Sequence, residues 1–170
     1  MASIIYGMQP YGFQNLEQNM ESYAVGKNSE VFAVFDPVTY TNGTIAVAGT
    51  TNSIMGVAMK AQTMSSTNNG AANVTPLTVP VDETTVFLMG GGNSATTGFN
   101  LIADVGTYWK LTGTTGSVQV DIGAGVQTTT NRNVMIVKVD PLNEGTTGST
   151  SAGDHKVLVK VVRRPTWIDQ

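Results

Sequence analysis

Hydrophobic and polar positions alternate along most of the chain. From Lys27 to Arg163, short runs rich in Val, Ile, Thr and aromatic residues are separated by clusters of Gly, Asn, Pro and Thr. A period of two, interrupted by turn residues, is typical of β-strands, and no segment between the runs suits an ordinary helix. The predicted strands are Val31–Phe35, Thr44–Ala48, Ile54–Lys60, Thr78–Val81, Thr85–Met89, Val105–Leu111, Ser117–Ile122, Asn133–Val139 and Lys156–Val162.

The connections between these runs indicate how the strands pair. Most are short turn sequences such as Thr41–Thr44 and Leu111–Ser117, whereas parallel strands need long crossover connections. The sequence therefore predicts an all-β domain, an antiparallel β-barrel or β-sandwich. In its last strand, Val157, Val159 and Val161 are expected to share the buried face.

Three longer polar segments are expected to be loops. Unstructured loops of about twelve residues are uncommon in compact domains and are usually functional or mobile, so we expect these loops to serve contact or presentation. They are Gln62–Pro76, Met89–Phe99 and Leu142–Gly153.

The first twenty-six residues have a different character. Gly7, Pro10 and Gly12 oppose regular structure as far as Phe13, and one short helical stretch is expected at Asn15–Tyr23. We predict an extended N-terminal arm (residues 1–26), a β-domain (27–163) and a C-terminal tail (164–170). Flexible linkers are poor in aromatic residues, so the arm is expected to lie on a partner chain or, alternatively, on its own domain. The arm residues predicted to contact other chains are Tyr6, Tyr11, Phe13 and Tyr23.

Charge is sparse and unevenly distributed. Nine Lys and Arg against twelve Asp and Glu give a formal net charge of −3, so we expect neither nucleic acid nor an anionic membrane as a partner. Six of the nine basic residues lie in the last third of the chain. They indicate either a solvated edge strand or a basic tail that meets an acidic surface. Pro165 should take the tail out of the sheet. The tail residues predicted to lie at an interface are Arg163, Arg164 and Trp167.

The sequence offers little reactive chemistry. It has no cysteine, which excludes disulfides, thiolate metal sites and cysteine nucleophiles. Its single histidine, His155, is not accompanied by a serine nucleophile motif. It is expected to be solvated at the start of the last strand. Gly90–Gly92 and Gly123–Gly125 lack the following helix of a phosphate-binding loop. We therefore expect no enzyme, no metal and no cofactor. The first ten residues do not resemble a signal peptide, so a soluble chain made in a cytoplasm is expected.

Four segments carry a family resemblance: Glu30–Pro37, Ile54–Lys60, Val79–Val81 and Lys156–Val162. In these segments, and in its size, composition and arm, the chain resembles the head decoration (cement) proteins of tailed bacteriophages. The resemblance implies a small β-protein on the outside of an icosahedral shell, often a trimer, that clamps neighbouring subunits of the major capsid protein. It transfers no catalytic residue. Tail-tube and tail-completion subunits share much of this composition, which leaves a place in the tail as an alternative.

A second alternative is a carbohydrate- or cell-surface-binding β-module. It predicts a concave patch of exposed aromatic side chains around Tyr108, Trp109 or Phe99. The competing expectation is that Tyr108 and Trp109, adjacent on one strand, simply face opposite sides of the sheet.

Overall fold

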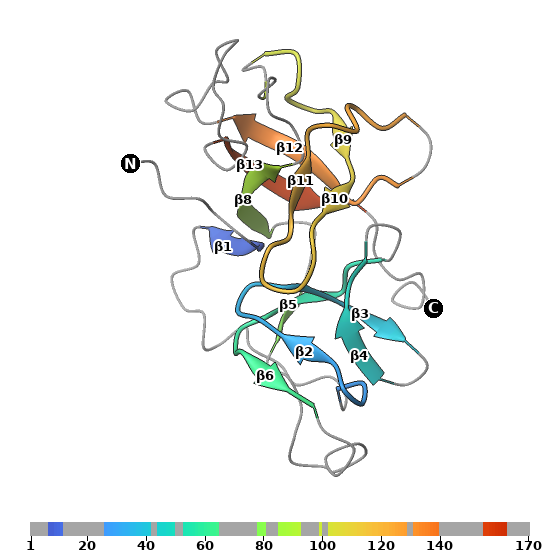
Figure 1. Cartoon of the computed structure of the whole chain (residues 1–170). Helices are drawn as coiled ribbons and strands as arrows, with labels where there is room; N and C mark the ends of the chain where they lie inside the picture. Colours follow the sequence, from blue (N-terminus) through green and yellow to red (C-terminus); the bar gives the residue numbers. More distant parts are fainter. Residues whose placement is uncertain are drawn as a thin grey trace, which may run out of the picture.

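In a computed structural model, every regular element of the described residues is a β-strand (Figure 1). The predicted all-β class is therefore confirmed. The strands form two groups, a large lobe above and a small lobe below in Figure 1. The structure describes residues 7–11, 26–41, 44–49, 53–64, 78–80, 85–92, 99, 102–128, 131–139 and 155–162.

The large lobe is a seven-stranded sheet. Its strands are β1 (Gln9–Tyr11), β8 (Val86–Gly92), β9 (Tyr108–Trp109), β10 (Leu111–Thr112), β11 (Gln119–Asp121), β12 (Val134–Val139) and β13 (Lys156–Val161). Across the sheet the order is β10, β11, β8, β13, β12, β9, and β1 pairs with β8 outside this path. The strand β8 thus holds three partners and organises the lobe.

The small lobe combines two short sheets. Its strands are β2 (Val31–Phe32), β3 (Pro37–Thr41), β4 (Thr44–Val47), β5 (Gly56–Ala58), β6 (Gln62–Thr63) and β7 (Thr78–Pro80). One sheet has the order β4, β3, β5, β7, and the other pairs β2 with β6. The predicted strand Val31–Phe35 ends at Phe32 instead, because the chain turns before Pro37, which opens the unpredicted strand β3. Proline is tolerated at the first residue of a strand.

One pair of strands corrects the prediction of antiparallel pairing. β11 runs parallel to β8, with Val120 opposite Gly91 and Asp121 opposite Gly92. The chain leaves β8 at Gly92 and returns only after β9 and β10, which makes the connection long enough for a parallel crossover.

The large sheet curls until its two edges meet. The edge strands β9 and β10 are separated only by Lys110, where the predicted strand Val105–Leu111 is divided. No ladder joins them, so the predicted barrel is wrong as a closed barrel. Asn133 spans the seam: its side-chain oxygen accepts from the Leu111 N–H at 3.2 Å, and its own N–H donates to the Trp109 carbonyl at 3.0 Å.

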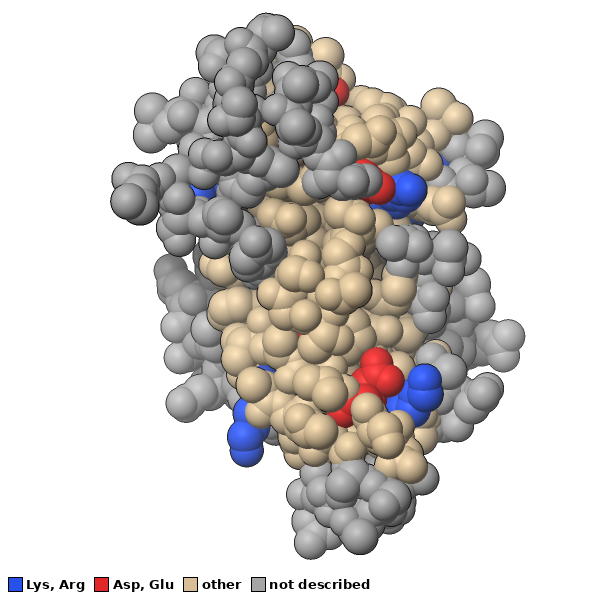
Figure 2. All heavy atoms as spheres, viewed as in Figure 1, with Lys and Arg blue, Asp and Glu red and all other residues tan. Residues whose placement is uncertain are grey.

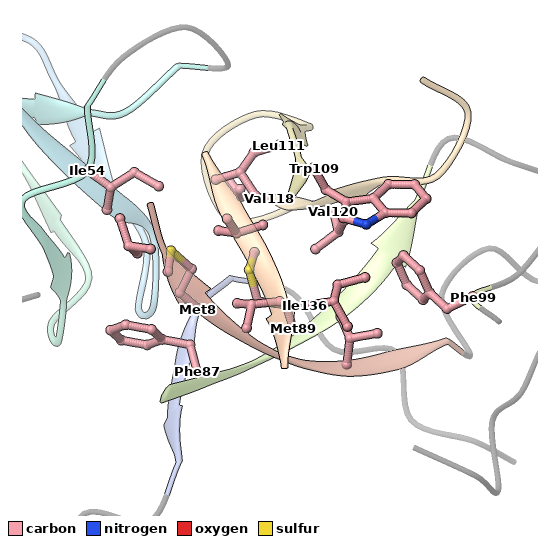
Figure 3. Packing of buried hydrophobic residues seen from close by; sticks show 14 of the residues in the cluster. Met8, Ile54, Phe87, Met89, Phe99, Trp109, Leu111, Val118, Val120 and Ile136 are labelled. Carbon is pink, nitrogen blue, oxygen red and sulfur yellow. The ribbon is translucent and has the colours of Figure 1, made fainter. Parts of the chain in front are cut away.

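The larger apolar core fills the large lobe and continues into the small one. Phe87 and Met89 of β8 belong to the same buried cluster as Ile54 and Val57 of the small lobe, and Met8 packs with them (Figure 3). A second cluster fills the small lobe itself. Its buried members are Phe32, Val38, Ile45, Met55, Ala58 and Met64.

The last strand shows the predicted alternation but not the predicted place. Val157, Val159 and Val161 are buried, while Lys156 and Lys160 are partly exposed. However, β13 lies between β8 and β12. The expectation of a solvated edge strand is therefore wrong, because pairing on both sides makes β13 a central strand of the sheet.

Two predicted loops begin as strands. Gly90, Gly91 and Gly92 extend β8 rather than opening the loop Met89–Phe99. At Gly91 a side chain would collide with Ile122 and Phe99, so glycine is needed for this close packing. Likewise β6 occupies the first two residues of the loop Gln62–Pro76. The third predicted loop, Leu142–Gly153, lies outside the described residues.

Candidate functional site

Of the predicted interface residues, the structure describes Tyr11. It ends β1 opposite Val86, and its side chain is 55% exposed. An exposed tyrosine at the end of a strand is available for contact, so its interface role stays a prediction. The helical stretch expected at Asn15–Tyr23 lies outside the described residues. So do the other predicted interface residues, Tyr6, Phe13, Tyr23, Arg163, Arg164 and Trp167.

Residues 7–11, which we call the N-terminal strap, hold the two lobes together. The Gly7 N–H donates to the Val118 carbonyl of the large lobe at 2.8 Å. The Met8 N–H donates to the Phe35 carbonyl of the small lobe at 2.7 Å, and the Met8 side chain is fully buried. Beyond it, β1 pairs with β8. For these five residues, the structure confirms the alternative expectation for the arm, which is that it packs on its own chain.

Gly7 is required by this close approach. Its φ is +74°, a region that side chains rarely adopt, and a Cβ there would lie 2.6 Å from the Phe35 carbonyl oxygen. Phe35 itself has a φ of +72°. The strap and the turn before β3 therefore fit together with no space for a side chain at residue 7.

Asp36 provides a second connection between the lobes. Its carboxylate is fully buried and accepts from the Ala33 N–H at 2.9 Å and, from the large lobe, from the Gly116 N–H at 2.9 Å. Burial raises the pKa of the Asp36 carboxyl above its ordinary value, and the two backbone donors only partly oppose this rise. Asp36 and Gly116 thus form a junction whose strength depends on protonation. The sequence reasoning missed this turn, although the Asp-Pro dipeptide at 36–37 is a signal that could have indicated it.

Other carboxylates of the described residues also stabilise local structure. Asp121 is buried, lies 3.2 Å from the Lys110 ammonium and accepts from the Ala124 N–H. Glu30 accepts from the Val47 N–H at 3.0 Å and so caps an edge of β4. Such contacts hold turns and edges rather than a reacting molecule.

The prediction that His155 is solvated is wrong. Its side chain is 3% exposed, and its ring meets the Phe99 ring edge to face at 6.4 Å between centroids. His155 is buried because it directly precedes the central strand β13, and its carbonyl accepts from the Gly91 N–H. Within the described ranges, no group of three or more His, Asp or Glu side chains is placed to hold a metal ion.

The aromatic patch predicted for a carbohydrate-binding module is not formed by its candidate residues. Trp109 and Phe99 are buried and pack edge to face at 5.3 Å. Tyr108 is partly exposed, but the Arg132 guanidinium lies 4.8 Å from its ring centroid. The competing expectation is confirmed: Tyr108 and Trp109 face opposite sides of the sheet.

Three exposed apolar side chains lie on the two loops next to β9, and we call them the β9-flanking residues: Ile102, Val105 and Val126. Ile102 is 87% exposed, and Val105 and Val126 are 43% and 46% exposed. Both of their loops are fixed to the sheet, through the Gly106 N–H to the Ile136 carbonyl and the Gln127 N–H to the Tyr108 carbonyl. The sequence reasoning missed these three residues as contact candidates, and it placed Val105 at the start of a predicted strand.

The surrounding surface carries little charge. On the face shown in Figure 2, neutral residues cover most of the described surface; the charged side chains are few, and in two places an acidic and a basic side chain lie side by side. The other large exposed hydrophobic side chains of the described residues are Tyr11, Val31, Val34, Tyr40 and Val162. Scattered apolar residues are ordinary on a protein surface, so the 87% exposure of Ile102 is the more informative feature.

Comparisons with known proteins add no relative. A scan against protein-family models finds no match, and neither does a search of curated proteins or of solved structures. None of the described residues belongs to a helix long and apolar enough to cross a membrane.

Proposed function

We propose that this chain is a structural virion protein that decorates a phage capsid and stabilises it by binding between subunits of the major capsid protein. In this proposal it acts on the outside of the shell as a homo-oligomer, with a trimer favoured, and catalyses no reaction. The finer architecture that we propose is a sandwich-like scaffold of two lobes.

The observation that carries the proposal is the exposure of the β9-flanking residues, above all of Ile102. An aliphatic side chain that is 87% exposed buries little apolar area in its own subunit. The backbone hydrogen bonds of Gly106 and Gln127 hold the two loops in place. Apolar side chains on loops that are already held in place lose little backbone entropy on binding, which favours contact with another protein.

The described ionisable groups also support a binding role, because the buried carboxylates among them have structural partners within the fold. The buried carboxylates, Asp36 and Asp121, have backbone donors as partners, and the second also pairs with Lys110. A neutral surface avoids the cost of removing charges from water at an interface. A protein that binds the assembled lattice but not separated subunits stabilises the lattice by mass action.

Sedimentation tests this proposal. Because the chain has no cysteine, Thr115→Cys in an exposed turn gives one labelling site. The labelled full-length chain is mixed with shells assembled from the major capsid protein of the same genome, and separately with its unassembled capsomers. We expect saturable binding to shells, no binding to capsomers and a higher temperature of shell disruption.

Substitutions locate the binding surface. Ile102→Ser should weaken shell binding at least about tenfold, as expected for an interface anchor, whereas Ala61→Ser, at an exposed position of the small lobe, should leave it unchanged. Absence of binding to shells would contradict the proposal. Sedimentation with purified tails instead would assign the chain to the tail, and glycan-array binding by the isolated chain would favour the carbohydrate-binding alternative.

A further inference from the structure

We propose that the N-terminal strap is exchanged between copies of this chain, so that residues 7–11 of one subunit occupy the strap site of a neighbouring subunit. The strap site consists of the Val118 carbonyl, the Phe35 carbonyl and the edge of β8 at Val86–Leu88. The proposal rests on the proposed function, which expects a homo-oligomer, and it names the element that joins the subunits.

The strap is bound almost entirely through its backbone and one side chain. Gly7 and Met8 donate to one carbonyl in each lobe, and β1 pairs with Val86–Leu88. Met8 supplies the one fully buried side chain, within the cluster that contains Phe87. These contacts require only the correct short segment at the site. Strand addition to a sheet edge works in the same way when the strand comes from another chain.

The connection that follows the strap is long enough to reach a neighbour. Residues 12–25, fourteen in number, separate Tyr11 from Gly26, which bridges to Ile45 in the small lobe. Fourteen extended residues span up to roughly 46–50 Å. A compact chain of 170 residues has a radius of gyration of about 15 Å. The chain length therefore permits the strap of one subunit to dock on a subunit in contact with it.

Exchange costs little once subunits are adjacent. The docked strap makes the same contacts in its own chain and in a second copy, so the two arrangements differ only through the connecting residues and the local concentration of sites. Tyr11 is the last strap residue before the connection that would cross to the neighbouring copy. Exchange therefore links subunits through contacts already built into the fold.

Disulfide trapping in the cysteine-free chain tests the exchange. Gln9 and Leu88 are direct Cα partners across β1 and β8, a spacing that suits a disulfide. Chains carrying only Gln9→Cys are refolded with an equal amount of chains carrying only Leu88→Cys, then oxidised and separated by non-reducing electrophoresis. With random docking among equal numbers of both chains, about half of the Gln9→Cys chains should form the mixed disulfide.

A matched pair controls for chance collisions. Thr112 and Gln119 are Cα partners in the β10–β11 pair, which has a short connection. Chains with Thr112→Cys mixed with chains with Gln119→Cys should form only background amounts of mixed disulfide. Tyr11→Cys with Val86→Cys gives a second exchange pair, in case the first disturbs folding.

The decisive comparison uses both cysteines in one chain. If the double variant Gln9→Cys/Leu88→Cys closes its disulfide within a single chain, and mixed single variants give no more cross-linking than the control pair, the exchange proposal is overturned. Shell sedimentation of the same variants separates the two proposals. Intact binding without mixed disulfides rejects exchange alone, whereas lost binding with mixed disulfides rejects the capsid role alone.

Discussion

The two lobes achieve stability by different means. The large lobe contains strands of six and seven residues, such as β12 and β8, in one curled sheet. It holds most of the larger apolar cluster. The small lobe uses strands of two to five residues and a smaller cluster around Phe32. It also relies on the Glu30 cap of β4, and it shares Ile54 and Val57 with the core of the large lobe. A lobe with so little core of its own needs the shared core and the junction.

The largest expected effect comes from truncating one large buried side chain in either core. Phe87→Ala in the large lobe should lower the free energy of unfolding by about 3–5 kcal/mol, and Phe32→Ala in the small lobe by a similar amount, because both side chains are almost fully buried. Since the larger cluster spans both lobes, we expect one cooperative transition in each variant. The measurement is urea unfolding followed by circular dichroism and by tryptophan fluorescence. Separate transitions for Phe32→Ala would show that the small lobe unfolds alone.

Breaking the strap contact should have the next largest effect. Gly7→Ala combines the cost of a positive φ with a collision at Phe35, so we expect a loss of about 2–3 kcal/mol. Gly106→Ala is the matched control, because its φ is +81° but no atom lies within 4 Å of the added Cβ. It should cost only the conformational term, about 1 kcal/mol. Equal losses in the two variants would mean that the strap is not closely packed.

The seam of the large lobe depends on one amide. Asn133→Ala leaves the buried Leu111 N–H without its acceptor and should cost about 2 kcal/mol. Amide hydrogen exchange at Leu111 should accelerate as the seam opens. Asn28→Ala, in an exposed turn of the small lobe, should change stability by less than about 0.5 kcal/mol. An unchanged exchange rate at Leu111 would argue against closure of the seam by Asn133.

The smallest expected effect is a pH dependence at the junction. Since burial raises the pKa of Asp36 in the folded chain, the folded state binds its proton more tightly than the unfolded state. The resulting stability is fully present below the unfolded pKa of about 3.9 and is lost as the pH rises through the folded pKa. Relative to Asp36→Asn, the chain should therefore lose stability with rising pH in that window. Urea unfolding at several pH values measures this difference, and a constant difference would contradict it.

Much of the fold could be predicted from local patterns. The last strand was predicted from the alternation of Val157, Val159 and Val161, and this prediction holds because one face of β13 is buried throughout. The opposite orientations of Tyr108 and Trp109 follow from the same period of two. Both are properties of a few neighbouring residues.

The candidate contact surfaces could not be predicted in the same way. Tyr11 was chosen because aromatic residues stand out in the arm, and its contact role stays a prediction. The docking of Gly7 and Met8 depends on Val118 and Phe35, which are distant in sequence. The solvated His155 and the edge position of β13 were wrong for one shared reason. Which strand becomes central is decided by pairing among distant segments, and no local pattern records it.

By itself, the sequence determined that this chain forms β-strands, where most of them lie and that disulfides play no part, because alternation, turn residues and the absence of cysteine are local or compositional properties. Only the tertiary structure decided the parallel pairing of β8 and β11, the seam at Asn133 and the shared core at Met8. These depend on which distant surfaces fit together in three dimensions, and that fit is a property of the whole packed chain.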